Sequence, residues 1–534
     1  MNKIPGFSAP SAPLPGRSSL SVIAGCAASR FITFSLLFVL LLASPRATRS
    51  QTLAGVPEPG EDAEFLQVFH SISSHEILGY VEEMSADRYL GRLSGTPEYM
   101  EVAQWVADLL DQWGIQPAGD GGSYFQWFDM PYSEVLSAGA LSVTLREGEE
   151  ETVIRYSFPE DYYPGTNSDA GTVSGELVYV GYSITAPELG YDDYAGMDVA
   201  GKIVVMESGV PYTGDDDDTT MAWVPYAYHQ SKLNNAARHG AAGVLYVGKL
   251  ANPNTSFNEG LVYVHIDEHV ADHLFFGTGH SREDLLARTR EELAPASLAL
   301  NKEATITAEA IRHPEGRSAN VLGLLEGSDP VLKEEVIIVG GHLDAVGFLG
   351  VPFPGALDNG SGVADILGAA RALAASPVKP KRSILFLFIG GEECGLIGSD
   401  VYTKNPVFPV ENTVAFFNLD MVGHGTGLRV SGGASYPRIQ RHFDAANERY
   451  LHRPLAASEE RISIGRPRSD GVIFQRAGFR SLGFGTTGRV EGIPTYYHDP
   501  RDTTASLTPE IMEDVAKLIF VGFTGLANDQ ELGF

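Results

Sequence analysis

Short apolar runs, each followed by polar residues, form the clearest pattern in the second half of the chain. Such runs lie at 336–339, 383–389 and 414–419, and the segment 361–375 between the first two has apolar positions at helical spacing. Strands that lack polar alternation and are separated by helices predict a sheet that is covered on both faces. We therefore predict an α/β fold with a mixed, mostly parallel central sheet flanked by helices.

Further helices are predicted before and after this region. Thr96 and Pro97 are typical of a helix start, because a hydroxyl caps the first N–H groups and proline fits the first turn. Apolar residues spaced three and four apart continue to Trp113, and Gly114 ends the pattern. The last predicted helix covers about 509–526.

The middle of the chain, about 165–310, has a different pattern. Strand-like runs, of which 202–206 and 243–247 are the clearest, alternate there with turns and with a short helical segment that ends at Gly240. We interpret this part as a β-rich inserted domain. The predicted organisation is a leader over 1–50, the first part of the main domain over 51–164, the insertion over 165–310 and the rest of the main domain over 311–534.

The first fifty residues are typical of an export signal. Their charged residues are all basic, and the apolar run at 31–43 is shorter than the roughly 20 residues that span a bilayer. We predict cleavage and export to the periplasm or the extracellular space, with no stable membrane insertion afterwards. An uncleaved membrane anchor and lipid attachment at Cys26 are the alternatives, but Cys26 precedes the apolar run, whereas a lipid-attachment motif follows it.

Composition narrows the classes of partner. Acids outnumber bases 68 to 38, giving a formal charge of −30, which argues against nucleic acid and against anionic membrane surfaces. Two cysteines exclude a disulfide-stapled scaffold and a zinc site built on several thiolates. Four consecutive aspartates at 215–218 are typical of a solvated loop, with a calcium site as the second interpretation.

Acids and histidines gather where the predicted strands end, which is where open α/β sheets carry their sites. Burying several carboxylates without cations is costly, and a divalent metal is the simplest compensation. Two histidines and three carboxylates suit a pair of zinc ions with one carboxylate bridging them. The residues in this set of strand-end and loop positions are His342, Asp344, Asp358, Glu392, Glu393, Asp420 and His498.

The chain also resembles a known family, the two-zinc (co-catalytic) aminopeptidases among the metallo-exopeptidases, in the group with an inserted protease-associated (PA) domain. The strings that carry the resemblance are GGHLDAVG, ALDNGSGVA, GGEECGLIGS, FFNLDMVG and YYHDPRDT, in the family's order. The segment 165–310 is similar to the PA domain, so the main domain would be a zinc peptidase catalytic domain.

The resemblance implies a role for each strand-end residue. His342 and Asp420 would hold one zinc ion, Glu393 and His498 the other, and Asp358 would bridge them. It also implies that Asp344 orients the His342 ring, that Glu392 is the general base, and that the 358–359 peptide is cis. Adjacent side chains point in different directions, so Glu393 can bind metal while Glu392 faces the water.

The implied activity is hydrolysis of N-terminal residues from peptides by a metal-bound water whose proton Glu392 takes. Candidate substrate-binding residues are Ser469, Asp470 and Tyr497. Many relatives have Ser-Asp-His where this chain has Ser469, Asp470 and Gly471, so the side-chain preference stays open. The resemblance favours a monomer, because the helical domain through which some relatives dimerise does not follow the last motif.

Three alternatives share this type of site. A carboxypeptidase that acts on acidic C-terminal residues would need a cationic pocket, for which Arg468, Arg480, Arg489 and Arg501 are candidates. A glutaminyl cyclase typically uses one zinc ion, which the complete set of five ligands disfavours. A non-catalytic receptor-like homologue would lack ligands or the base. Metal content separates these classes: two zinc ions favour a peptidase, one a cyclase and none a receptor.

Overall fold

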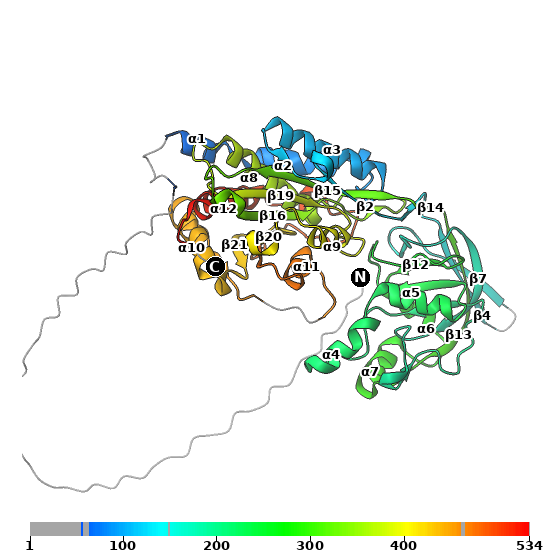
Figure 1. Ribbon diagram of the computed structural model, residues 1–534. Helices are drawn as coiled ribbons and strands as arrows, with labels where there is room; N and C mark the ends of the chain where they lie inside the picture. The colour runs from blue at the N-terminus through cyan, green and yellow to red at the C-terminus, as the bar shows by residue number, and fades with distance from the viewer. Residues whose placement is uncertain (1–54, 57–62, 148–149, 461–464, 533–534) are drawn as a thin grey trace, which may run out of the picture. The chain divides into compact units, whose positions relative to one another are not determined.

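The computed structural model describes residues 55–56, 63–147, 150–460 and 465–532 (Figure 1). The predicted leader at 1–50 lies outside these residues. No helix among the described residues is both long enough and apolar enough to cross a bilayer.

A mixed sheet forms the centre of the main domain. Its middle strands β19, β16, β20 and β23 run parallel to one another, whereas β15 on one side and β21 on the other pair antiparallel. The strand order is β1 (Gln116–Pro117), β15 (Arg317–Leu325), β19 (Ser383–Ile389), β16 (Val336–His342), β20 (Thr413–Leu419), β23 (Ser481–Thr487), β21 (Gly427–Ser431) and β22 (Leu455–Ala457), with β2 (Phe125–Asp129) also paired to β15.

Helices cover both faces of this sheet, as the apolar runs predict. One face packs Ile337, Val339 and Phe386 against a layer of six helices. The other face packs Phe416 against Phe474, with ring centroids 3.6 Å apart. The first layer contains α1 (Ala63–Ser71), α2 (Ser74–Met84), α3 (Pro97–Gln112), α8 (Ser361–Ala375), α10 (Pro437–Ala446) and α12 (Pro509–Asn528), and the second contains α9 (Ile397–Lys404) and α11 (Asp470–Arg476).

Helix α3 begins as its sequence predicts. The side chain of Thr96 accepts a hydrogen bond from the Tyr99 N–H at 3.2 Å, and Pro97 is the first helical residue. The buried face runs from Tyr99 to Leu110, whereas Trp113 is only half-buried. Gly114 follows with φ of 73°, which terminates the helix.

A second sheet lies in the inserted region. Its strands β7, β10, β11 and β12 are parallel, and the outer strands pair antiparallel. The order is β5 (Glu150–Arg155), β4 (Ala140–Glu147), β13 (Leu298–Ala308), β7 (Gly171–Tyr179), β10 (Ile203–Met206), β11 (Gly243–Val247), β12 (Val262–Ile266) and β6 (Tyr162–Pro164). Since β4, β5 and β6 precede residue 165, the sheet draws on more of the chain than the predicted insertion, whose bounds stay a prediction.

Helices also pack on both sides of the second sheet. Helix α5 (His229–Arg238) places Leu233 and Ala236 against one face, and α6 (Glu268–Phe275) and α7 (Arg282–Glu292) lie over the other. The short helix α4 (Asp217–Trp223) contains part of the acidic run. Asp216 caps this helix by accepting a hydrogen bond from the Thr219 N–H at 2.8 Å.

Small strands and loops complete the contact between the two regions. Strands β3 (Tyr132–Val135) and β14 (Ala310–His313) pair with each other, as do β17 (Gly347–Phe348) and β18 (Pro352–Phe353). The β17–β18 hairpin packs Leu349 and Phe353 against Tyr163 and Ala251 of the inserted region. This apolar contact lies next to the strand ends that carry the predicted site.

Candidate active site

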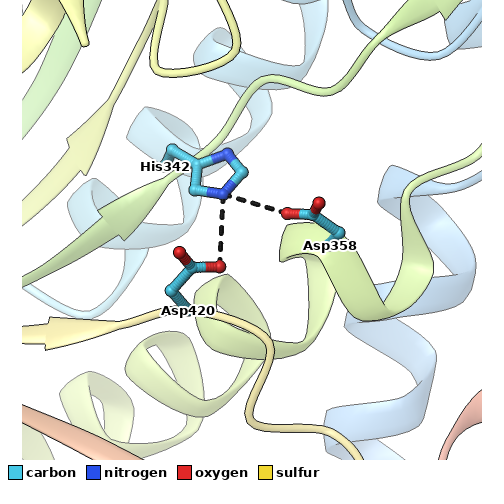
Figure 2. Close-up of side chains that lie close together, drawn as sticks. All are labelled: His342, Asp358 and Asp420. Atoms are coloured by element: carbon cyan, nitrogen blue, oxygen red, sulfur yellow. Dashed lines mark ion pairs between the residues drawn. The ribbon is translucent and has the colours of Figure 1, made fainter. Parts of the chain in front are cut away.

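The strand-end residues converge at the carboxyl edge of the parallel strands. His342 is the last residue of β16, and Asp420 directly follows β20, its parallel neighbour. Asp358 lies in the segment η6 (Ala356–Gly360), just before α8. Figure 2 shows the three side chains pointing toward one another. We call these three residues the sheet group.

The sheet group has the geometry of a ligand cluster. His342 Nε2 lies 3.2 Å from Asp358 Oδ1 and 3.5 Å from Asp420 Oδ1 (Figure 2). All three potential ligand atoms lie within 4.8 Å of one another. His342 and Asp358 are buried, and Asp420 is partly exposed.

A second cluster shares Asp358 and is called here the loop group. His498 Nε2 lies 2.8 Å from Glu393 Oε2 and 3.5 Å from Asp358 Oδ2. Asp358 therefore directs one carboxylate oxygen to each group. Among the described residues, no further group of three His, Cys, Asp or Glu side chains brings its ligand atoms this close together. Of the four aspartates at 215–218, Asp216 caps α4, and Asp217 and Asp218 lie in its first turn.

Buried atoms without partners test whether a metal fits this site. Glu393 Oε1, Asp420 Oδ1 and His498 Nε2 are buried and make no hydrogen bond among the described residues, although the last two lie at ion-pair distance from other ligand atoms. Leaving such atoms unsatisfied is costly. Each group offers one imidazole nitrogen and two carboxylate oxygens, a donor set that suits zinc. The residues present therefore fit a divalent metal.

The pKa shifts of the two histidines show how negative the site is. Burial alone would lower the pKa of His342, but the charges of Glu392, Asp358 and Asp420 raise it well above its usual value. Burial also opposes the rise at His498, where Glu393 and Asp358 raise the pKa to about 9. A site that attracts protons this strongly also attracts metal cations, which compete with protons for the same nitrogens.

Asp344 links the ends of two neighbouring strands. Its backbone carbonyl lies 3.1 Å from His342 Nδ1, whereas its carboxylate is 3.8 Å from the same nitrogen. The carboxylate accepts the backbone N–H groups of Glu392 and Glu393 at 3.2 and 3.3 Å. Asp344 therefore touches the His342 ring mainly through its carbonyl, while its carboxylate fixes the loop that carries both glutamates.

Glu392 is half-buried and lines a cavity that Glu393 and His498 of the loop group also line. Burial raises the pKa of its carboxyl well above the usual value, and the neighbouring charges of Asp470, Glu393 and Asp420 add to the rise. Its backbone is held by Asp344, so its side chain is free to face the cavity while Glu393 joins the loop group.

Two charged residues that the sequence analysis did not assign hold the segment around Asp358. Both carboxylate oxygens of Asp502 accept backbone N–H groups, from Leu357 at 2.9 Å and from Asp358 at 3.0 Å. Arg92 is fully buried and donates to the carbonyls of Leu343 and Gly355 at 2.7 Å each. The peptide between residues 358 and 359 is cis, as expected.

The inserted region contributes one contact to the site. The ring of His498 donates from Nδ1 to the backbone carbonyl of Ala251 at 2.5 Å. This bond leaves Nε2 directed at Glu393 and Asp358, which is the tautomer that metal binding needs. A backbone carbonyl has no side-chain signature, so no pattern in the sequence indicates this contact.

The three candidate substrate residues lie in different places. Tyr497 lines the cavity, is 52% exposed and stacks on the His498 ring with centroids 3.9 Å apart. Asp470 is buried at the start of α11 and accepts a hydrogen bond from Ser399, so it does not line that cavity. Ser469 lines a separate hollow that includes Asp420.

A mixed α/β sheet with linked ligand clusters at its strand ends defines a class of metal-dependent hydrolase. Residues 320–521 match the family model described as Peptidase family M28, and residues 173–274 match the model described as PA domain. Residues 320–521 therefore belong to peptidase family M28, and the inserted region contains a PA domain.

Relatives of known description agree with this family. The aminopeptidase YwaD of Bacillus subtilis is 26% identical over 404 residues, covering 72% of this chain and 78% of the relative. An aminopeptidase of Pseudomonas aeruginosa is 25% identical over 371 residues, covering 66% of this chain and 60% of its own length. The similarity therefore covers only part of each of these two relatives.

Solved structures share the fold. The zinc aminopeptidase BSAP from Bacillus subtilis has a TM-score of 0.57 at 21% identity, covering 84% of this chain and 94% of that structure. The aminopeptidase from Aneurinibacillus sp. strain AM-1 has a TM-score of 0.56 at 22% identity, covering 86% and 95%. At this level of sequence identity, the similarity shows a shared fold.

Proposed function

We propose that the chain is an exported, zinc-dependent aminopeptidase that hydrolyses N-terminal residues from peptides, with Glu392 as the general base. The observation that carries the proposal is the pair of ligand groups that share Asp358 next to a cavity lined by Glu392. The family and the aminopeptidase names of its relatives support the reaction class.

The proposed ligands are His342, Asp358 and Asp420 for one zinc ion and Asp358, Glu393 and His498 for a second. Zinc bound there supplies an activated water and stabilises negative charge on the oxygen of the scissile carbonyl. Asp344, Asp502 and the Ala251 carbonyl form hydrogen bonds that hold the segments or rings of the proposed ligands. Such partners of ligands set their orientation and basicity.

Glu392 would move the proton. Its carboxylate would accept a proton from the attacking water and return it to the nitrogen of the scissile peptide bond, so that the shortened peptide leaves as a neutral amine and not as an anion. The burial and negative surroundings that raise its pKa make it a stronger base than an exposed glutamate. The negative potential of the site also favours the protonated α-amino group of a peptide substrate.

The first test is the requirement for a free amino group. The zinc-loaded protein is expected to hydrolyse leucine p-nitroanilide and to leave N-acetyl-leucine p-nitroanilide intact. The same comparison of free and N-acetylated substrates, made with dipeptides, shows whether the enzyme requires a free N-terminus. Cleavage of N-acetylated dipeptides at an equal rate would replace the aminopeptidase by a carboxypeptidase.

The second test removes the base and leaves the ligands in place. Glu392→Gln is expected to lower kcat on leucine p-nitroanilide by about 10²- to 10⁴-fold, the range that general acid–base catalysis supplies. Its zinc content should equal that of the wild type. The matched control is Glu411→Gln, the same change at an exposed position. Activity of Glu392→Gln within a few-fold of the control would rule out the role assigned to this side chain.

Export and a monomeric state are further parts of the proposal. Both come from the sequence analysis: export rests on the basic leader and the apolar run at 31–43, and the monomeric state is an expectation from the family resemblance. Expression of the full chain with detection of a shortened product outside the cytoplasm tests export. Light scattering of that product tests the monomer.

A further inference from the structure

A cavity of about 780 Å³ opens beside the candidate ligands and is built by both domains. Glu392, Glu393 and His498 contribute to it from the catalytic domain. Tyr246 and His265 contribute from the inserted domain, with their rings stacked at a centroid distance of 4.9 Å. Its volume is in the range of small-ligand sites.

The charges around this cavity are segregated. Its carboxylates are Glu392 and Glu393, which belong to the proposed catalytic centre, and its guanidinium groups are Arg466 and Arg468. The whole chain has 68 acids and 38 bases. The part of the cavity around Arg466 and Arg468, which has arginines and no acids, therefore has the opposite charge to the chain as a whole. The part of the cavity that Arg466 and Arg468 line therefore attracts anions.

Arg466 has no counter-charge among the described residues. Its Nη1 atom is buried without a hydrogen-bond partner in the part of the chain that the structure describes, and the groups that shift its pKa include no carboxylate. Burial, followed by the positive charge of Arg468, lowers the pKa of Arg466. Burying part of an unpaired guanidinium group costs free energy unless an anion binds to it.

His229 and His265 also line the cavity but do not contribute positive charge to it. Burial, with Arg466 next in effect, lowers the pKa of His229 to about 3, and burial lowers that of His265 to about 4. Both rings are therefore neutral at neutral pH. The permanent positive charge of the cavity comes from the two arginines.

We propose that Arg466, assisted by Arg468, binds a carboxylate of the peptide substrate in this cavity. The inference rests on the proposed peptidase function and adds a substrate class to it: short peptides whose terminal carboxylate reaches the cavity, or peptides with an acidic side chain near the scissile bond. The planar fork of an arginine matches a carboxylate through two hydrogen bonds.

Other arginines that the sequence singled out are placed elsewhere. Arg480 donates to the backbone carbonyls of Thr413 and Val414, and Arg501 pairs with Asp499. Arg489 is exposed and does not line the cavity. Arg489→Met is therefore a matched control for Arg466→Met, since it removes the same charge from a site outside the cavity.

The kinetic test compares substrates that differ only in a carboxylate. Three pairs of peptides place the carboxylate at different positions. Leu-Gly-Gly and its C-terminal amide test the terminal carboxylate. Leu-Glu-Gly-amide against Leu-Gln-Gly-amide tests an acidic second residue, and Glu-Gly-Gly-amide against Gln-Gly-Gly-amide tests an acidic first residue. In at least one pair the wild type and Arg489→Met should prefer the carboxylate by about 10-fold or more in kcat/KM. That ratio should fall below about twofold in Arg466→Met and be partly retained in Arg466→Lys.

A binding measurement separates this proposal from the proposed function. Calorimetry on zinc-loaded Glu392→Gln and on Glu392→Gln/Arg466→Met gives the Kd of the same three pairs. A carboxylate preference that depends on Arg466 supports the inference even when no peptide is hydrolysed, in which case the peptidase function fails alone. A ratio near one in every pair, or a preference that survives Arg466→Met, overturns the inference.

Discussion

The two halves of the candidate metal centre are built in different ways. In the sheet group, His342 and Asp420 stand at the ends of β16 and β20, two adjacent parallel strands in the core of the sheet. In the loop group, Glu393 lies in a loop after β19, and His498 lies in a long segment between β23 and α12. The loop group also depends on the Ala251 carbonyl of the inserted domain.

The two groups therefore differ in which domain positions their residues. His342 and Asp420 stand at strand ends that the ladder hydrogen bonds of the buried sheet fix, so two of the three residues of the sheet group are positioned by the catalytic domain alone. The loop group has in addition one hydrogen bond from the inserted domain, between His498 and the Ala251 carbonyl. The PA domain is therefore part of the candidate site, and events in that domain should change one half of the centre more than the other.

Removing the residue common to both halves should have the largest effect. Asp358→Ala takes one ligand from each group, and a metal centre contributes several kcal/mol of transition-state stabilisation, so kcat/KM should fall by about 10³-fold or more. Zinc content after dialysis should fall for both ions. Asp400→Ala, at a partly exposed aspartate of α9 that pairs with Lys404, is the control. Asp358→Ala with near-normal zinc content would show that the two groups do not share this ligand.

Loosening the loop around Ala251 should have a smaller and one-sided effect. Thr166 donates from its hydroxyl to the Asn252 carbonyl at 2.6 Å, next to the contact that holds His498. Direct partners of metal ligands contribute about 10- to 100-fold to affinity or activity, and Thr166→Val acts one step further away, so a loss of about tenfold or less is expected.

The measurement for this variant is the rate of zinc release to a chelator. One of the two ions should leave faster from Thr166→Val, while the release of the other is unchanged. Ser174→Ala, which removes an exposed hydroxyl contact with Thr305 in the same domain, is the control. Equal acceleration of both ions would contradict the division into a sheet group and a loop group.

The sequence predicts the centre of the fold and the strand-end residues because both follow from local patterns, whereas the division of the ligands into two groups is implied by the family resemblance. Apolar runs mark the parallel strands, and the polar residues after them mark the carboxyl edge. The segment 361–375 matches α8 at both ends. The antiparallel edges of the sheet are less evident, since strands such as β21 and β22 are short and lack a distinctive pattern.

The supporting contacts are not accessible to the same reasoning. Arg92 donates to a carbonyl 251 residues away, and nothing in its neighbourhood in the sequence indicates such a bond. Ala251 acts through its backbone. Asp502 lies within the quoted string YYHDPRDT, but its bond to the Asp358 N–H depends on how two distant loops meet. Long-range contacts of this kind follow from the tertiary structure and not from residue type.

The zinc stoichiometry of the intact chain tests the central claim most directly. The protein is stripped of metal, titrated with zinc, freed of unbound metal and analysed by plasma mass spectrometry, with hydrolysis of leucine p-nitroanilide followed at each step. The two linked groups predict two zinc ions per chain, with full activity only when both are bound. Full activity with one zinc ion, or in the metal-free protein, would contradict the account.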